Sequence, residues 1–377
     1  MAGIYIHVPF CACKCLYCDF FSTPALRLKE AWLQAAIGEM ELRRDYLGGE
    51  SVATIYFGGG TPSLLAASDL ERIFNAIGRL FTVDANAEVT LEANPDDMTP
   101  PYVASLRSLP VNRVSMGVQS FSDADLRFLG RRHDSRRARQ AIAACLLHGF
   151  DNISIDLIYA LPGQTLRQWE ANLAEAAGMA LPHISAYHLS YEADTRLYAM
   201  LEAGQVQPAG EDDSADMFNL LSDRLVEAGY EHYEISSFAL GGRVSRHNSS
   251  YWEGRKYLGI GPSAHSFNIE SREWNISSIA EYIKGISRGA PVVEREAPHP
   301  YNEYIMTGLR TSRGIETAYI SDRFGRESLE FCLKESEKYI KAGILEDKGD
   351  RLSLSRRGML VSDAVIRSLF RVDSYTK

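Results

Sequence analysis

Short apolar runs and longer amphipathic stretches alternate along the first half of the chain. The short runs have the length and the β-branched or aromatic content of strands, and they cover residues 3–8, 54–57, 88–93, 111–119, 152–160 and 184–190. The intervening stretches have helical spacing, over residues 26–47, 67–81, 123–129, 135–149 and 165–177. Strands that alternate with helices predict an α/β fold with a parallel sheet, either closed or doubly wound. Six units are too few for an eight-stranded barrel, so we expect an incomplete (β/α)6 barrel of the TIM type.

The alternation stops near residue 191, and the pattern beyond it is less regular. Residues 212–229 predict a helix, and residues 230–238 predict a strand. Residues 243–267 are rich in glycine and aromatic residues and contain two histidines. On this composition we expect them to form an ordered loop, not a linker.

A domain junction is predicted at residues 289–300 (GAPVVEREAPHP). Three helices, a short hairpin and a last helix are expected after it, which predicts a smaller, mainly helical and winged-helix-like domain. The chain would then consist of a barrel domain at residues 1–288 and a C-terminal domain at residues 289–377. The mixed charge of the second domain argues against DNA binding.

The composition is that of a globular protein, with 45% hydrophobic and 24% charged residues among 377. The net charge of −9 argues against nucleic-acid binding through bulk charge. No apolar run approaches the ~20 residues that span a bilayer, and the first ten residues, MAGIYIHVPF, lack the features of a secretory signal. We therefore expect a cytoplasmic protein whose clustered cysteines serve metal or redox chemistry rather than disulfides.

Four of the six cysteines lie in one eight-residue stretch, CACKCLYC. Neighbouring thiolates repel one another unless a soft metal centre neutralises them. Cys11, Cys15 and Cys18 have the spacing Cys-x3-Cys-x2-Cys, which favours an iron–sulfur cluster with one iron left open. The alternative is a structural zinc site, which normally takes ligands from two separated pairs. The distant Cys145 and Cys332 supply no second pair, and Cys145 is expected to pack in the core.

Other candidate residues stand at the ends of predicted strands. Three glycines, Gly58 to Gly60, follow the second strand directly and let the backbone approach a ligand closely, although a plain tight turn explains them as well. Glu92 closes the third strand and is either a ligand contact or a solvated charge. Asp156 is the lone acid of an apolar strand, and a buried carboxylate needs a hydrogen-bonding partner from the protein or from a ligand.

These residues belong to motifs that resemble a known family. A Cys-x3-Cys-x2-Cys loop after a first strand is similar to the radical S-adenosylmethionine (SAM) superfamily. Six further motifs, in order over nearly all of the chain, resemble its oxygen-independent coproporphyrinogen oxidase branch, HemN and its relative HemW. They read GIYIHVPFC, GGGTP, LEANP, SMGVQSF, DLIYALPGQT and HNSSYW.

The resemblance implies a [4Fe-4S] cluster held by Cys11, Cys15 and Cys18. Its open iron would bind the amino and carboxylate groups of SAM, and electron transfer through the cluster would cleave a C–S bond to give a 5′-deoxyadenosyl radical. Cys13 occupies a variable position and is expected to be a bystander. The resemblance to this superfamily thus implies two cofactors, the [4Fe-4S] cluster and SAM.

The resemblance also implies which residues contact SAM. Tyr5 would lie beside the cluster and the methionine part of SAM. The residues expected to offer backbone groups to the amino group are Gly59, Gly60 and Thr61. The residues expected at the charged ends are Glu92 and Arg131, where the planar guanidinium suits a carboxylate. The residues expected around the ribose and adenine are Gln119, Asp156 and Ile158, which would give Asp156 the partners that its burial requires.

Two departures from the HemN pattern bear on function. HemN-type oxidases have a further cysteine two residues after the last ligand, where this chain has Phe20, and a longer segment before the first cysteine. Both differences resemble HemW, a family of haem chaperones that deliver haem to acceptor proteins. Its HNxxYW motif begins here at His247, which becomes the expected haem ligand. A structural histidine is the alternative, and His265 is a weaker candidate ligand.

The resemblance favours a haem chaperone in which the cluster and SAM are accessory. The alternative is a coproporphyrinogen III oxidase that decarboxylates its substrate to protoporphyrinogen IX, and a zinc-stabilised α/β protein is the third alternative. Whether SAM is cleaved, and so whether the chain is an enzyme, stays open at this stage. The expected partners are haem or a porphyrin, a haem-acceptor protein, and an electron donor such as flavodoxin or ferredoxin. Peripheral membrane association is allowed, and nucleic acid is not expected.

Overall fold

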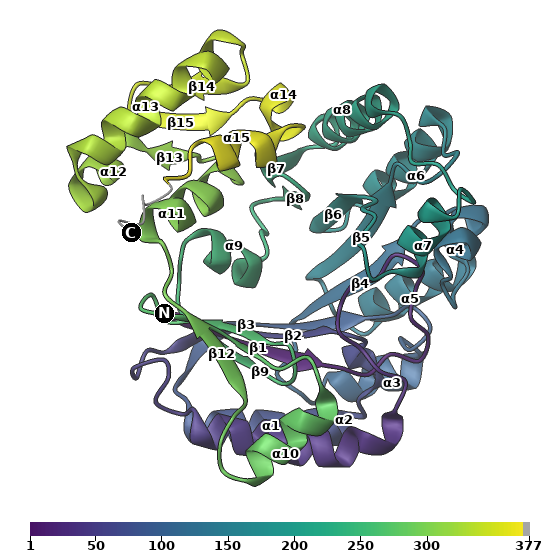
Figure 1. The fold of residues 1–377 in the computed structure, drawn as a ribbon. Coiled ribbons are helices and arrows are strands. Elements are labelled where there is room, and N and C mark those ends of the chain that lie inside the picture. The colour runs from purple at the N-terminus through teal and green to yellow at the C-terminus, as the bar shows by residue number, and fades with distance from the viewer. Residues whose placement is uncertain (372–377) are drawn as a thin grey trace.

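A twelve-stranded mixed sheet curves around a central space in the computed structural model, which describes residues 1–371 (Figure 1). In their order across the sheet, the strands are β12 (Val293–Glu296), β11 (Arg272–Asn275), β10 (His265–Phe267), β9 (Tyr257–Ile260), β1 (Ala2–Val8), β2 (Val52–Gly59), β3 (Val83–Ala93), β4 (Arg113–Gln119), β5 (Ile153–Tyr159), β6 (His183–His188), β8 (Ser237–Leu240) and β7 (Tyr230–Glu234). Strands β1 to β6 are parallel throughout. The predicted incomplete barrel, with its six strands, is therefore confirmed.

The sheet continues beyond the six predicted strands at both edges. On one edge, β9 pairs in parallel with β1, and β10, β11 and β12 add antiparallel strands. The prediction of a loop over residues 243–267 is therefore wrong, because this stretch contains α9 (Arg246–Trp252), β9 and β10. On the other edge, β8 pairs with β6, and the single strand predicted over residues 230–238 is instead the β7–β8 hairpin, which extends to Leu240.

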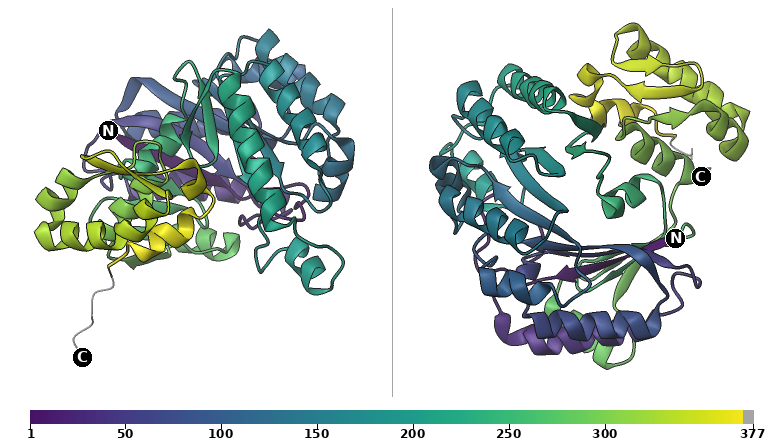
Figure 2. Two further views of the ribbon diagram at one scale, coloured as in Figure 1. Left: turned by 90° about the horizontal axis from the view of Figure 1, so that it is seen from above. Right: turned by 180° about the vertical axis from the view of Figure 1, so that it is seen from behind.

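Helices cover the outer face of the curved sheet, as Figures 1 and 2 show. The helices that follow strands in the barrel are α1 (Lys29–Leu42), α2 (Ala67–Leu80), α3 (Pro100–Leu106), α4 (Asp123–Leu129), α5 (Ser135–Leu147), α6 (Leu166–Gly178), α7 (Arg196–Glu202), α8 (Glu211–Glu227) and α10 (Ile279–Ser287). Short 3-10 helices occupy Leu26–Leu28 and Pro62–Leu64. Within residues 1–371, no helix has both the length and the hydropathy to cross a bilayer.

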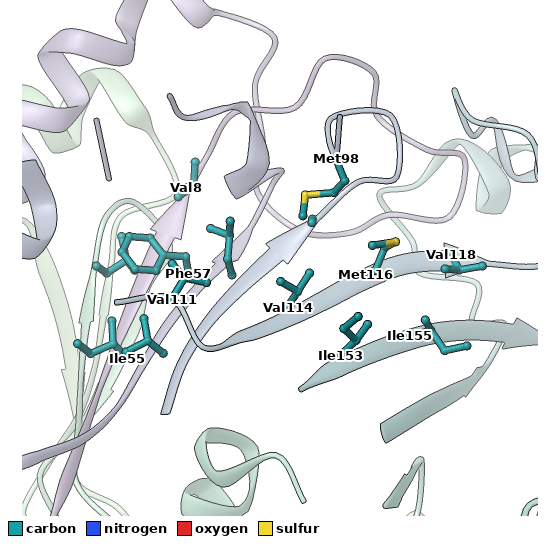
Figure 3. Close-up of a cluster of buried hydrophobic side chains, with 14 of the residues drawn as sticks. Val8, Ile55, Phe57, Met98, Val111, Val114, Met116, Val118, Ile153 and Ile155 are labelled. Atoms are coloured by element: carbon teal, nitrogen blue, oxygen red, sulfur yellow. The ribbon is translucent and has the colours of Figure 1, made fainter. Parts of the chain in front are cut away.

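The main core lies between the sheet and these helices, and alternate side chains of each strand supply it. Figure 3 shows part of this cluster, in which the labelled strand residues are fully or almost fully buried: Val8, Ile55, Phe57, Val114, Met116, Val118, Ile153 and Ile155. Cys145 packs in the same core, as predicted. Because side chains alternate along a strand, the intervening polar positions face the inside of the barrel. This alternation places Tyr56, Glu92 and Asp156 in the lumen.

The C-terminal part has a second hydrophobic core of its own. Its elements are α11 (Pro300–Leu309), β13 (Ile315–Glu316), α12 (Thr317–Phe324), α13 (Arg326–Lys341), β14 (Leu345–Asp347), β15 (Arg351–Leu354), α14 (Arg356–Met359) and α15 (Ser362–Ser368). The order β13-β15-β14 contains the expected hairpin. This part docks on the barrel through Ile235 N–H, which donates to Arg310 O at 3.1 Å, and Ser312 N–H, which donates to Tyr233 O at 3.0 Å. The domain boundary at residue 289 stays a prediction, and β12 belongs to the barrel sheet.

Candidate functional site

The cysteine loop follows β1 and lies at the carboxyl ends of the parallel strands, where sites in such folds are built. Cys11, Cys15 and Cys18 are half-buried free thiols, whereas Cys13 is exposed. Thr61 Oγ1 donates to Cys11 Sγ at 3.5 Å, and Arg131 Nη1 donates to Cys15 Sγ at 3.4 Å. Two of the residues expected to bind SAM therefore touch two of the expected cluster ligands.

The chemistry of this donor set fits a [4Fe-4S] cluster. Burial raises the pKa of Cys18 to about 11, a backbone hydrogen bond from Phe20 opposes this rise, and the neighbouring Cys15 adds to it. Among residues 1–371, no three His, Cys, Asp or Glu side chains are already gathered as a metal site. Three soft sulfur donors without disulfide partners still match the ligand set of an iron–sulfur cluster. Metal binding would stabilise the Cys18 thiolate, which burial disfavours.

The glycine turn after β2 is packed against the start of the cysteine loop. A Cβ atom at Gly60 would lie 2.5 Å from Phe10 O and 2.8 Å from Val8 O, closer than any side chain allows. Gly59 has a φ of +102°, in the region that favours glycine. These two positions therefore require glycine so that the turn can approach the loop.

The N–H groups of this turn are already engaged within the protein. Gly59 N–H donates to Glu92 Oε2 at 3.2 Å. Gly60 N–H donates to Val8 O at 2.8 Å, and Thr61 N–H donates to Phe10 O at 2.7 Å. An ammonium group only donates hydrogen bonds. The turn could therefore bind the amino group of SAM only through its carbonyl oxygens. Of the backbone groups that the family resemblance implies for this contact, the N–H groups are excluded.

Two buried carboxyl groups in the lumen, those of Glu92 and Asp156, lie close enough for their charges to interact. Glu92 Oε1 accepts from Tyr56 Oη at 2.8 Å, and burial raises the pKa of Glu92. Burial, and then the charge of Glu92, raise the pKa of Asp156 to about 7. Within residues 1–371, no protein group donates a hydrogen bond to the Asp156 carboxyl. Of the two partners that the sequence leaves open for this carboxyl, a protein group or a ligand, the described chain does not supply the first.

Arg113 is a lumen residue that the sequence reasoning missed. Its side chain is 2% exposed, and its Nε has no hydrogen-bond partner in the described chain. Its charge opposes the upward pKa shifts of both Glu92 and Asp156. The alternation of Arg113 with Ser115 and Gly117 on β4 was the available signal, because these positions share the inner face.

A pH-dependent stability is expected from Asp156. Its pKa is 3.8 in an ordinary environment and about 7 in the folded protein, so between these values the unfolded chain releases a proton that the folded chain keeps. Stability should therefore fall as pH rises through this interval and stay constant above it. Asp156→Asn should be more stable than the unmutated protein at about pH 8 by a few kcal/mol, with a smaller difference at about pH 5. Urea unfolding at both pH values measures this.

A matched control for this prediction is Asp151→Asn, since the Asp151 side chain is 81% exposed. This variant should keep the pH dependence of the unmutated protein. An Asp156→Asn protein whose stability varies with pH as before would show that Asp156 ionises normally in the folded chain.

The remaining SAM candidates lie at the same mouth of the barrel. Arg131 Nη2 donates to Gly117 O at 2.7 Å, and its Nε has no protein partner in residues 1–371. Gln119 adopts a positive φ of 68° at the end of β4, beside Arg131. Ile158 is 4% exposed and packs in a small apolar cluster against Leu16 of the cysteine loop. Their contacts with SAM stay predictions, but the fold brings them together.

Tyr5 of β1 contacts the rings of two neighbouring lumen residues, His7 and Tyr56. Its hydroxyl lies 3.4 Å from His7 Nδ1, and its ring stacks with that of Tyr56 at a centroid distance of 6.1 Å. Burial raises the pKa of Tyr5, so its hydroxyl stays protonated. The residue therefore lies three positions before the end of the strand that carries the cysteine loop, and its contact with SAM stays a prediction.

His247 is buried on α9 and both of its ring nitrogens are engaged. Nδ1 lies 2.8 Å from Thr54 Oγ1, Nε2 lies 2.7 Å from Tyr251 Oη, and the residue is 1% exposed. Burial lowers its pKa to about 3, so the ring is neutral. Haem ligation by His247 stays a prediction, and it would require Nε2 to exchange Tyr251 for iron.

A large cavity lies beside this histidine, between the barrel mouth and the C-terminal part. Its volume is about 1180 Å³. Its walls come from the cysteine loop, α9, β9, β10, α11 and α12, and His265 opens into it. Tyr251 lines the cavity, whereas His247 lies behind it.

Comparisons with known proteins agree with this arrangement. The radical SAM superfamily model matches residues 5–176, and the HemN C-terminal domain model matches residues 296–361. The chain is 34% identical to the heme chaperone HemW of Mycobacterium tuberculosis, over 97% of this chain and 94% of the relative. It is 30% identical to HemW of Bacillus subtilis, over 97% and 98% of the two chains.

A solved structure shares the whole fold. Coproporphyrinogen III oxidase (HemN) of Escherichia coli superposes with a TM-score of 0.85 at 21% identity, covering 99% of this chain and 90% of that one. At 21% identity, this match shows that the two proteins share a fold and does not by itself show a shared function. Given a radical SAM domain, a HemN C-terminal domain and similarity to HemW proteins over almost their full length, the chain belongs to the HemW family of the radical SAM superfamily.

Proposed function

We propose that this protein is a haem chaperone, which binds haem and transfers it to an acceptor protein. The observation that carries the proposal is the full-length similarity, at 30–34% identity, to several proteins named heme chaperone HemW. Phe20 supports it, because a phenylalanine cannot act as a ligand or redox group where HemN-type oxidases have a cysteine. Its side chain is 60% exposed and lines the large cavity.

The [4Fe-4S] cluster and SAM follow from membership of the superfamily. Cys11, Cys15 and Cys18 would hold the cluster, and Arg131 and Asp156 would bind the carboxylate and the ribose of SAM. When bound, these cofactors supply one-electron redox chemistry. The chain itself supplies a half-buried mouth and an unpaired lumen carboxyl, which orient SAM and limit the access of water.

The remaining partners are proposed on the same basis. A haem carrier needs an acceptor protein, and a redox-active cluster needs an electron donor such as flavodoxin or ferredoxin. We place the protein in the cytoplasm, with peripheral contact to a membrane where the acceptor is a membrane protein.

The experiment that tests the function compares binding with turnover. Protein reconstituted with iron and sulfide without oxygen is titrated with haem, mixed with a haem-free acceptor such as apomyoglobin, and followed by its visible spectrum. We expect stable haem binding followed by transfer. A parallel incubation with SAM, reductant and coproporphyrinogen III should yield no protoporphyrinogen. Its formation over many turnovers would instead establish the oxidase.

A further inference from the structure

We propose that haem occupies the cavity between the barrel mouth and the C-terminal part, with its iron bound by His265. This inference rests on the proposed function and names the site that carries it out. It assigns the iron to a histidine outside the HNxxYW motif.

The first observation concerns the nitrogens of the two candidate histidines. His265 is exposed to the cavity, and within residues 1–371 neither of its ring nitrogens makes a hydrogen bond to protein. The other histidines of the described chain all have a hydrogen bond at the ring. A haem ligand must present an imidazole nitrogen with a free lone pair. His265 meets this requirement as it stands, whereas His247 would first have to give up a buried bond.

The ring of His265 is also held in place. It stacks on Trp274 of the neighbouring strand, with a centroid distance of 5.8 Å and an interplanar angle of 26°. The β10–β11 pairing sets these two residues opposite each other. A ligand with a fixed ring plane loses little conformational freedom when it binds a metal.

The cavity suits a flat, largely apolar macrocycle. Its volume of about 1180 Å³ lies somewhat above the roughly 300–1,000 Å³ of most small-molecule sites, as a macrocycle requires. Aromatic side chains line it from both parts of the molecule, among them Phe20, Trp252, Phe267 and Tyr319. Phe20 and Tyr319 are 60% and 44% exposed, which is unusual for side chains of this size. Burial of these rings against a porphyrin would remove apolar surface from water.

Cationic side chains in the cavity suit the two propionates of haem. Arg323 of α12 lines the cavity and forms no ion pair or hydrogen bond within residues 1–371. The other two arginines of the wall are already paired, Arg255 with Glu253 and Arg272 with Glu303. The acids Asp19 and Glu270 also line the cavity, so Arg323 is the group that a propionate would pair with. Haem would then bridge the barrel and the C-terminal part.

The test uses cluster-reconstituted protein titrated with haemin and, separately, with metal-free protoporphyrin IX. His265→Ala should lose the histidine-ligated Soret band and bind haemin on the order of tenfold more weakly. Its affinity for protoporphyrin IX should be unchanged, because only the iron contact is removed, and added imidazole should restore the Soret band. His247→Gln, which keeps a hydrogen-bonding group beside Thr54, should retain the spectrum of the unmutated protein. Circular dichroism checks that both variants are folded.

A second pair of variants tests the propionate contact. Arg323→Ala should weaken haemin and protoporphyrin IX equally, whereas Arg326→Ala, whose side chain is 87% exposed on α13, should change neither. A His265→Ala protein with the unmutated spectrum and affinity would overturn the assignment, as would loss of ligation in His247→Gln alone. Failure of the unmutated protein to bind either compound would instead overturn the proposed haem-chaperone function itself.

Discussion

Replacing Cys15 with alanine is expected to abolish assembly of the [4Fe-4S] cluster, with iron and acid-labile sulfide falling to background. Three thiolates hold such a cluster in this family, and losing one leaves two irons without a protein ligand. The half-buried Cys15 Sγ is also the sulfur that accepts from Arg131 Nη1 at 3.4 Å. Its loss therefore disconnects the cluster loop from a residue expected to bind SAM. Metal and sulfide analysis after oxygen-free reconstitution measures the effect, together with the broad visible absorbance.

The matched control is Cys13→Ala in the same loop. Cys13 is exposed, and its carbonyl oxygen accepts from Cys11 Sγ at 3.1 Å, a contact that the substitution keeps. This variant should assemble the cluster fully. Full iron in Cys15→Ala, or loss of iron in Cys13→Ala, would mean that the ligand set is different. A colourless protein that purifies with zinc and no sulfide would support the zinc alternative.

The parallel half of the barrel was predictable because its signals are local. In β2, β4 and β5, apolar residues on one face alternate with polar or small residues on the other, as with Ile55 and Tyr56 or Ile155 and Asp156. That alternation gives both the strand and the face that meets the helices. Because parallel strands end at one edge, the polar residues at their ends were expected to converge. Glu92, Arg131 and the cysteine loop do so.

The strands beyond β1 were not predictable in the same way. β9 has only four residues, YLGI, in a glycine-rich stretch, and its partner is β1, with Gly3 opposite Tyr257. A pairing between strands so far apart in the sequence leaves no local periodicity. His247 shows the same limit: the motif identified the residue, but its burial against Thr54 of β2 depends on tertiary packing.

A buried carboxylate on α1 connects this helix to the edge of the sheet that β9 to β12 form. Glu39 of α1 is fully buried and accepts four hydrogen bonds, from Arg43 Nη1, Gly261 N–H, Asn275 Nδ2 and Tyr282 Oη, at 2.7–3.1 Å. These donors come from the residue that follows α1, the β9–β10 turn, β11 and α10. Arg43 Nη2 in turn donates to the buried Glu273 at 2.8 Å. One side chain near the start of the chain therefore holds three segments that lie more than 220 residues later in the sequence.

Glu39→Ala is accordingly expected to lower the free energy of unfolding by about 3–5 kcal/mol, because it leaves buried donors such as Gly261 N–H and Tyr282 Oη without an acceptor and removes one of the two carboxylates that pair with Arg43. Glu39→Gln should recover only part of this loss, since all four neighbours donate and the amide NH₂ would face donors. The control is Glu41→Ala on the same helix, where the 53% exposed carboxylate pairs with Arg79 and should cost at most about 1 kcal/mol. Urea unfolding compares the three. If Glu39→Ala proved as stable as Glu41→Ala, the antiparallel edge would be held by apolar packing alone.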